Sequence, residues 1–320
     1  MKEANHERIL VSVVKEIAEN SDIELQSFSH DWILQLGLGD KTRHIVGYNF
    51  EINSATAHML AADKAATAGA LQAARIASVP HQLFLHPRLA NYVSSNGNWD
   101  QIQAFAKKNG FPLVVKPNEG TGGSSVTKVD NGLELEQSVT RLFEKTRAIA
   151  ISPYVEIEQE YRAIILDEKV LLSYAKMRPM LIGNGKASII ELLQRKSIEQ
   201  SIPQSLASKA LERYEGRLSD VLEEGEHLPL YWKHNLGTGA IPQIVAEEKL
   251  EKQIEALAIS AANAIGIRFA SVDIVQVDGQ MQILEINAGI MMEHFSRHFP
   301  EERERVKQIY SAAINAMFAE

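Results

Sequence analysis

The stretch from residue 269 to residue 289 constrains the fold of this chain more than any other. Two runs rich in Val and Ile flank the pair Asp278–Gly279, and such a pair between apolar runs is a strong signal for a β-hairpin. Three oxygen-bearing side chains, Asp273, Glu285 and Asn287, interrupt the apolar pattern. Because side chains alternate faces along a strand, Glu285 and Asn287 are predicted to project to the same side.

The length of the turn decides whether Asp273 joins them. A two-residue loop, Asp278–Gly279, sends Asp273 to the opposite face of the hairpin. A three-residue loop, Val277 to Gly279, shifts the register by one residue and places Asp273 diagonal to Glu285. We predict the three-residue loop, because three such groups on one buried face need a cation, and hard oxygen ligands suit magnesium. A half-exposed hairpin with solvated acids is the alternative.

Composition narrows the class of protein. The chain has 320 residues, of which 45% are hydrophobic, so it can bury a substantial core and is expected to form two or three compact parts. A net charge of −8 argues against nucleic acid or an anionic membrane as the main partner. The absence of cysteine excludes disulfides, thiolate metal sites and a cysteine nucleophile. No signal-peptide core and no membrane-spanning run is present, so we expect a cytoplasmic protein.

Helical and strand patterns alternate along the chain, which predicts an α/β fold. The segment from 201 to 228 is polar and gives no clear pattern. Helices are predicted at about 6–19, 55–60, 64–76, 133–145, 188–196, 246–265 and 301–318, and strands at about 23–28, 43–50, 113–117, 126–129, 148–151, 161–166 and 170–176.

A glycine-rich loop follows the predicted strand that ends at Lys116–Pro117. Gly120, Gly122 and Gly123 allow backbone amides to approach a ligand closely, and Ser124 adds a donor. The lysine supplies a point charge for phosphate. The loop leads into a strand and not a helix, so it fits neither the dinucleotide nor the P-loop pattern. A plain hairpin turn is the alternative.

The order of these features resembles the ATP-grasp superfamily, and most closely the ATP-grasp modules of cyanophycin synthetase and of bifunctional glutathione synthetases. The likeness covers about residues 45–295. It rests on Ala62-Asp63-Lys64, Val114-Val115-Lys116-Pro117 with the glycine loop, Tyr154-Val155, Glu160-Tyr161-Arg162, Arg178 with Gly183-Asn184-Gly185-Lys186, and Asp273, Glu285 and Asn287.

The resemblance implies an ATP-grasp fold in three parts. A small N-terminal α/β domain covers residues 1–62. A first ATP-grasp subdomain covers 63–155 and includes a glycine-rich lid at 111–155, and a second subdomain with the magnesium site covers 156–320.

The resemblance also implies roles for single residues. Lys64 and Lys116 contact the ATP phosphates, and the loop with Gly120, Gly122, Gly123 and Ser124 closes over them. Tyr154 and Val155 form a hinge at the adenine, and Glu160 binds the ribose. Asp273, Glu285 and Asn287 hold Mg²⁺, with Mn²⁺ as an alternative. Arg178 stabilises the acyl phosphate, and Lys176 reaches the γ-phosphate.

The implied activity is an ATP-dependent carboxylate–amine ligase, which forms an amide through an acyl phosphate and releases ADP and phosphate. Its partners would be a small carboxylate and an amine such as an amino acid or peptide, with no nucleic acid and no membrane. The resemblance does not decide whether the protein forms a homodimer. Two alternatives remain, namely an ATP-binding regulatory protein without turnover and a small-molecule kinase.

Several positions depart from the family pattern or have two interpretations. Ser152 stands where the family often has a hinge glutamate, Asn184 replaces an aspartate, and no Pro-Gly pair follows Asn287. Arg162 is either a structural ion-pair partner or a substrate contact. His294 is a candidate acid or base, and residues 233–239 resemble a family loop or form an ordinary turn.

Overall fold

The computed structural model describes residues 7–89, 92, 99–120, 122–123, 125–199 and 202–319. The chain divides into a first unit, residues 1–173 with 245–320, and a second unit, residues 174–244. Helices and strands occur in both units, which confirms the predicted α/β class. No helix in the described ranges is long and apolar enough to cross a membrane.

The N-terminal part of the first unit is an antiparallel sheet with strand order β1-β2-β3-β4. The sequence predicts only two strands here and misses β2, because the glycines on either side of Leu38 suggest a turn. In the structure β2 continues to Leu38, and the turn lies at Gly39–Asp40. The strands are β1 (Glu24–Phe28), β2 (Ile33–Leu38), β3 (Lys41–Val46) and β4 (Asn49–Phe50).

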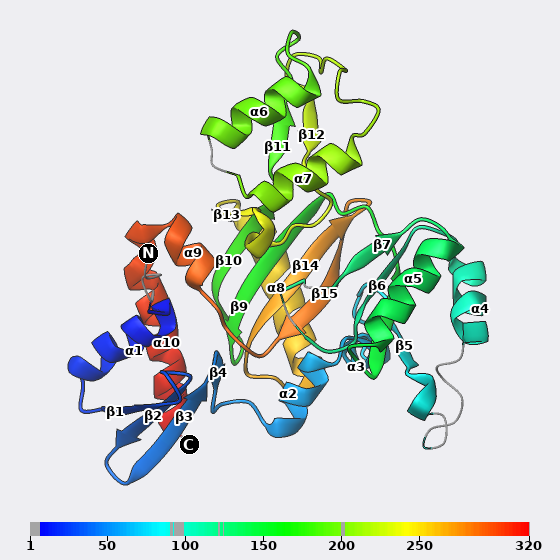
Figure 1. Cartoon of the computed structure of the whole chain (residues 1–320). Helices are drawn as coiled ribbons and strands as arrows, with labels where there is room; N and C mark the ends of the chain where they lie inside the picture. Colours follow the sequence, from blue (N-terminus) through cyan, green and yellow to red (C-terminus); the bar gives the residue numbers. More distant parts are fainter. Residues whose placement is uncertain are drawn as a thin grey trace. The chain divides into compact units, whose positions relative to one another are not determined.

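Helices from the two ends of the chain pack together beside this sheet, in blue and red in Figure 1. They are α1 (Ile9–Glu19) and α10 (Arg303–Phe318). Apolar residues of both helices are buried, and Lys307 adds an ion pair of 2.7 Å with Glu16.

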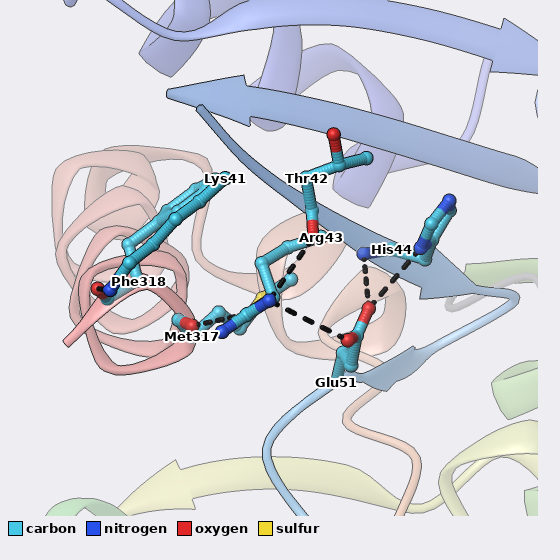
Figure 2. A network of polar contacts seen from close by, with 7 residues as sticks. All are labelled: Lys41, Thr42, Arg43, His44, Glu51, Met317 and Phe318. Atoms are coloured by element: carbon cyan, nitrogen blue, oxygen red, sulfur yellow. Dashed lines mark hydrogen bonds and ion pairs between the residues drawn. The ribbon is translucent and has the colours of Figure 1, made fainter. Parts of the chain in front are cut away.

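Strand β3 binds the C-terminal end of α10 (Figure 2). Lys41 Nζ donates to the carbonyl of Phe318 at 3.0 Å, and Arg43 Nε donates to that of Met317 at 2.6 Å. Glu51 accepts a hydrogen bond from the backbone N–H of His44 at 2.8 Å. The last carbonyls of a helix lack partners within it and carry partial negative charge, so two basic side chains stabilise this end.

A second sheet, with order β5-β8-β6-β7, carries the glycine loop. Helices α4 and α5 lie against it in Figure 1, and Asn131 caps α5 by accepting from the N–H of Glu134 at 3.0 Å. The sequence did not predict β5 or α4. The elements are β5 (Gln82–Leu85), α4 (Trp99–Asn109), β6 (Leu113–Pro117), β7 (Thr127–Val129), α5 (Gly132–Phe143) and β8 (Ala148–Pro153).

The predicted hairpin forms the centre of the first unit. Its first strand, β14, lies between β9 and β15 in an antiparallel arrangement, and all of its residues except Gln276 are buried. The segment before β5 adds to the outer edge of β15, because Val79 N donates to Ile283 O at 2.9 Å. The elements are β9 (Gln159–Leu166), α8 (Glu248–Ile265), β14 (Phe269–Val277) and β15 (Gln280–Asn287), with α2 (Ala55–Ala62), α3 (Lys64–Ala73) and α9 (Glu293–His298).

The second unit has a core of its own, formed by Leu181, Leu193, Leu206, Leu222 and neighbours. The sequence did not predict α7, β11, β12 or β13 in it. Strand β10 (Lys169–Met177) runs into this unit, where its end pairs with β13 (Ile241–Ile244). The other elements are β11 (Met180–Ile182), α6 (Ile189–Glu199), α7 (Gln204–Arg213) and β12 (His227–Pro229).

Candidate active site

The hairpin turn differs from the prediction. Val277 pairs directly with Gln280, so the loop has two residues, and the three-residue loop was wrong. Asp278 and Gly279 have φ values of 49° and 71°, as a type I′ turn requires at both central positions. This turn matches the right-handed twist of the two strands, which is why it is the preferred short connection.

The same hairpin nevertheless brings the two acids together, by means of a β-bulge. The register shifts between Asp273 and Ile274, and Leu284 has no partner in the ladder. Beyond this extra residue Asp273 pairs directly with Glu285, and directly paired side chains lie on the same face of a sheet. The prediction that Asp273 shares a face with Glu285 is therefore confirmed, but the two residues lie directly opposite and not diagonal, and the predicted cause was wrong.

One face of the central sheet carries the predicted polar residues. Glu160 pairs with Val275, and Arg162 pairs with Asp273. Since residues two apart in a strand share a face, Glu160 and Arg162 lie on the face of Asp273 and Glu285. Asn287, two residues after Glu285, follows on the same face, and its Nδ2 donates to Glu285 Oε1 at 3.2 Å.

Asp273 is held by an arginine. Arg162 Nε and Nη2 donate to Oδ1 and Oδ2 of Asp273, both at 2.7 Å. The aspartate side chain is 2% exposed and that of Arg162 19%. Such a bidentate, desolvated pair neutralises the carboxylate. The interpretation of Arg162 as an ion-pair partner is confirmed.

The oxygen-rich donor set suits a hard cation. Glu285 and Asn287 offer carboxylate and amide oxygens side by side, whereas both oxygens of Asp273 accept from Arg162. No group of three or more His, Cys, Asp or Glu with the spacing of a metal site occurs among the described residues. A cation at this face would therefore be held first by Glu285 and Asn287, whose oxygens lie side by side, with Asp273 shared between the cation and Arg162.

Lys64 connects helix α3 to the glycine loop. Asp63 caps α3 by accepting from Ala66 N at 2.7 Å. Lys64 Nζ donates to the carbonyl of Gly120 at 2.7 Å, and its backbone N–H donates to that of Asn118 at 3.1 Å. The ammonium is thus directed to the start of the loop.

The loop itself has the predicted backbone character. Gly120, Gly122 and Gly123 have φ values of 112°, 77° and 66°, a region that other residues adopt only with strain. Lys116, on the strand before the loop, is 7% exposed. Ser124 lies outside the described residues.

Lys64 and Glu285 line one pocket, although 221 positions separate them in the sequence. The pocket holds about 240 Å³ of empty space, including the part open to solvent. Its other lining residues are Ala61, Thr67, Ala68, Leu71, Ser78, Val79, His81, Ile283, Leu284 and Ile286.

His81, which lines the pocket, was not predicted from the sequence as a site residue. Burial, together with the positive charges of Lys116 and Lys64, holds its pKa well below the usual value, so the ring is neutral near pH 7. A single histidine after a proline carries no signal in the sequence; its position became visible only through the segment that joins β15.

The predicted hinge residues follow β8. Tyr154 N donates to Pro112 O at 3.0 Å, and its ring faces the ammonium of Lys128 at 4.4 Å. Val155 packs against an apolar cluster that contains Val79 and Val275. Glu160 is 6% exposed. Val155 thus lies beside the pocket residue Val79, and the roles assigned to Tyr154, Val155 and Glu160 stay predictions.

The segment after Asn287 is anchored to the N-terminal sheet. Ile290 N donates to Tyr48 O at 3.0 Å, and Tyr48 Oη donates to Glu293 Oε1 at 2.8 Å. Burial, and then the bond to Glu293, raise the pKa of Tyr48 to about 12. Burial also lowers the pKa of His294. These contacts, and not a Pro-Gly pair, fix the course of the chain here.

Lys176 and Arg178 belong to the second unit. Lys176 is 3% exposed, and its carbonyl accepts from Nδ1 of His234 at 2.9 Å. Their catalytic roles stay predictions. In the nearby turn, Asn184 Oδ1 accepts from the backbone N–H of Ala187 at 2.8 Å, so the amide oxygen makes the bond that an aspartate would make. Burial and then the charge of Lys209 lower the pKa of Lys233 to about 8.

Comparisons with known proteins agree with this geometry. Residues 218–304 match the family described as RimK-like ATP-grasp domain. The chain is 24% identical over 325 residues to cyanophycin synthetase of Trichormus variabilis. This alignment covers 96% of this chain and 34% of that protein. It is 22% identical over 198 residues to the glutathione biosynthesis bifunctional protein GshAB of Streptococcus mutans, covering 57% of this chain and 26% of that one. The chain thus spans about a third of the length of the first of these curated relatives and about a quarter of the second.

Two solved structures are similar in fold. A D-alanine–D-alanine ligase from Bacillus anthracis superposes with a TM-score of 0.56 and 15% identity, over 83% of this chain and 70% of that one. A bifunctional glutathione synthetase from Pasteurella multocida gives a TM-score of 0.56 and 16% identity, over 96% and 44%. At such identities the likeness concerns the fold alone.

Proposed function

We propose that this chain, as a member of the ATP-grasp superfamily, is an ATP-dependent carboxylate–amine ligase. A substrate carboxylate would attack the γ-phosphate of ATP, giving an acyl phosphate and ADP; an amine would then attack the acyl carbon and release phosphate. The observation that carries the proposal is that Lys64 and Glu285 line one pocket. A cationic group for phosphate and an oxygen ligand for its metal thereby border the same space.

The residues of the first unit would act by position and charge. Lys64 and Lys116 would bind phosphate oxygens, and the glycine loop would cover them and exclude water. Glu160 would accept from the ribose hydroxyls, and Tyr154 and Val155 would border the base. Such a mechanism asks for little covalent chemistry from the protein.

The metal site would lie on the same sheet face. Glu285 and Asn287 are the residues that would hold Mg²⁺ or Mn²⁺, with Asp273 as a third ligand. The ion would neutralise phosphate charge. Arg178 and Lys176 are proposed to stabilise the acyl phosphate and to contact the γ-phosphate. The acceptor amine is proposed to be an amino acid or peptide, and the reaction to take place in the cytoplasm.

The first test measures ADP release with ATP, Mg²⁺ and pooled amino acids and small carboxylates. Release that needs both an acid and an amine supports the ligase. ADP formed together with a lasting phosphorylated product, without amine, would instead indicate a kinase. Tight ATP binding with no ADP in any mixture would indicate a regulatory protein.

The variants Lys116→Ala and Glu285→Ala are expected to lower ADP release by roughly a hundredfold or more, because each removes a charge that stabilises the transition state. Lys108→Ala and Glu136→Ala, on exposed faces of α4 and α5, are matched controls and should keep the wild-type rate. Near-normal turnover in Lys116→Ala or Glu285→Ala, with the fold intact by circular dichroism, would remove that residue from the site.

A further inference from the structure

His81 has one ring nitrogen engaged and one unsatisfied. Nδ1 lies 2.8 Å from the carbonyl oxygen of Val79. A carbonyl can only accept, so Nδ1 carries the proton and donates. In the neutral ring Nε2 is then an acceptor. This nitrogen is buried and has no hydrogen-bond partner among the residues that the structure describes.

An unsatisfied buried acceptor is costly and indicates a missing donor. His81 lines the pocket that also contains Lys64 and Glu285. None of the described residues donates a hydrogen bond to Nε2, so a ligand group at this nitrogen must bring its own N–H or O–H. Phosphate oxygens do not fit there, because they are acceptors, as Nε2 is.

The walls of the pocket distinguish between the donors that ATP can offer. These are the ribose hydroxyls and the exocyclic amine of adenine. Seven of the twelve lining residues are apolar, namely Ala61, Ala68, Leu71, Val79, Ile283, Leu284 and Ile286, and Val79 and Leu284 continue into the cluster with Val155 and Val275. Apolar walls suit the face of a flat base, whereas a ribose would leave hydroxyls without partners.

We propose that Nε2 of His81 accepts a hydrogen bond from the exocyclic amine of adenine, and that this bond makes the site select ATP over nucleotides without that amine. The inference rests on the proposed function, since it takes ATP to be the ligand. It adds a specificity residue on the linker between α3 and β5, far in sequence from the hinge residues 154 and 155. Guanine and hypoxanthine present an oxygen at the same ring position, and an oxygen would face the lone pair of Nε2.

The test combines changes in the protein with a change in the ligand. Dissociation constants are measured by calorimetry for ATP and for purine riboside triphosphate, which lacks the amine. The wild-type protein should bind ATP roughly three- to tenfold more tightly, as expected for one neutral hydrogen bond. His81→Leu should bind both nucleotides equally. His81→Gln, whose amide oxygen can replace Nε2, should restore the preference, and His81→Asn, which is shorter, should not.

His86→Leu, at the other end of β5 and outside the pocket lining, is the matched control and should keep the wild-type preference. Thermal melting checks that each variant is folded; if His81→Leu is not, His81→Gln and His81→Asn carry the comparison. A preference for ATP that persists in His81→Leu or His81→Asn, or equal binding of both nucleotides by the wild type, would overturn the inference and leave the ligase proposal standing. Failure of the wild type to bind any nucleotide would instead overturn both.

Discussion

Asp273 is the residue where an observed ion pair and the proposed metal site meet. Arg162 donates one hydrogen bond to each of its carboxylate oxygens at 2.7 Å. The side chain of Asp273 is only 2% exposed, so water cannot solvate its charge if Arg162 is removed. Arg162 thus neutralises the buried carboxylate of Asp273.

Replacing Arg162 with Met is expected to lower the free energy of unfolding by about 3 kcal/mol, because a buried carboxylate then lacks its partner. Urea denaturation at neutral pH measures the change. Lys252→Met is the control: Lys252 forms an exposed ion pair with Glu248, and its loss should cost below about 1 kcal/mol. Equal costs for the two variants would mean that the Arg162–Asp273 pair does not stabilise the fold.

Residues of the site were predictable to different degrees. Period-two alternation was enough to place Glu285 and Asn287 on one face. The partner of Asp273 was not predictable, because it depends on how β9 aligns with β14 over 111 positions of sequence. Tyr48 and Glu293 are 245 positions apart, and no local pattern relates them. Local periodicity thus fixes which face a side chain occupies, and only tertiary pairing fixes what it meets there.

Among the elements, the hairpin β14–β15 depends most on backbone conformation. Gly279 has φ +71°, and a Cβ there would meet no atom within 4 Å. A side chain at this position would therefore be strained but not obstructed. Gly69, within α3, also has open space around it and has no such φ.

Replacing Gly279 and Gly69 with alanine should change the stability of the protein in opposite directions. Gly279→Ala should destabilise the protein by about 1 kcal/mol, since left-handed backbone costs about 1–2 kcal/mol for residues with a Cβ. Gly69→Ala should stabilise it by about 0.5–1 kcal/mol, because alanine favours the helix. Thermal and urea unfolding of both variants provide the measurement. Stabilisation by Gly279→Ala would be incompatible with the type I′ turn.

Long and strongly periodic elements were predicted well. Helix α8 was predicted within two residues of its observed start. Helix α7 was missed because only Leu206 and Ala210 of its ten residues are buried, which leaves too weak an apolar pattern. Strand β5 has a single buried residue, Phe84. Elements that contribute few residues to a core cannot be found from periodicity, since periodicity reports burial.

At the scale of the whole molecule, separate hydrophobic cores support the chain. One contains Leu206 and lies in the second unit; another contains Leu135 and lies under the sheet of the glycine loop. Both leucines are 1% exposed. Cores that share no side chains can open independently.

Leu206→Ala should increase hydrogen exchange in peptides from 181–230 and leave those from 113–151 unchanged, because a cavity costs about 2–5 kcal/mol only where it forms. Leu135→Ala, matched in residue type and burial, should give the reverse pattern. Mass spectrometry of exchanged peptides measures both. If either variant loosened both sets of peptides equally, the two cores would unfold as one.

The unpaired Leu284 has a consequence for how this part of the chain can vary. Inserting or deleting a single residue between positions 274 and 284 would exchange the two faces of one strand and separate Asp273 from Glu285, whereas adding one residue to each strand would keep them opposite each other. We therefore expect the length of this ribbon to tolerate only paired changes, in natural variation as in engineering, unless the turn itself is rebuilt at the same time.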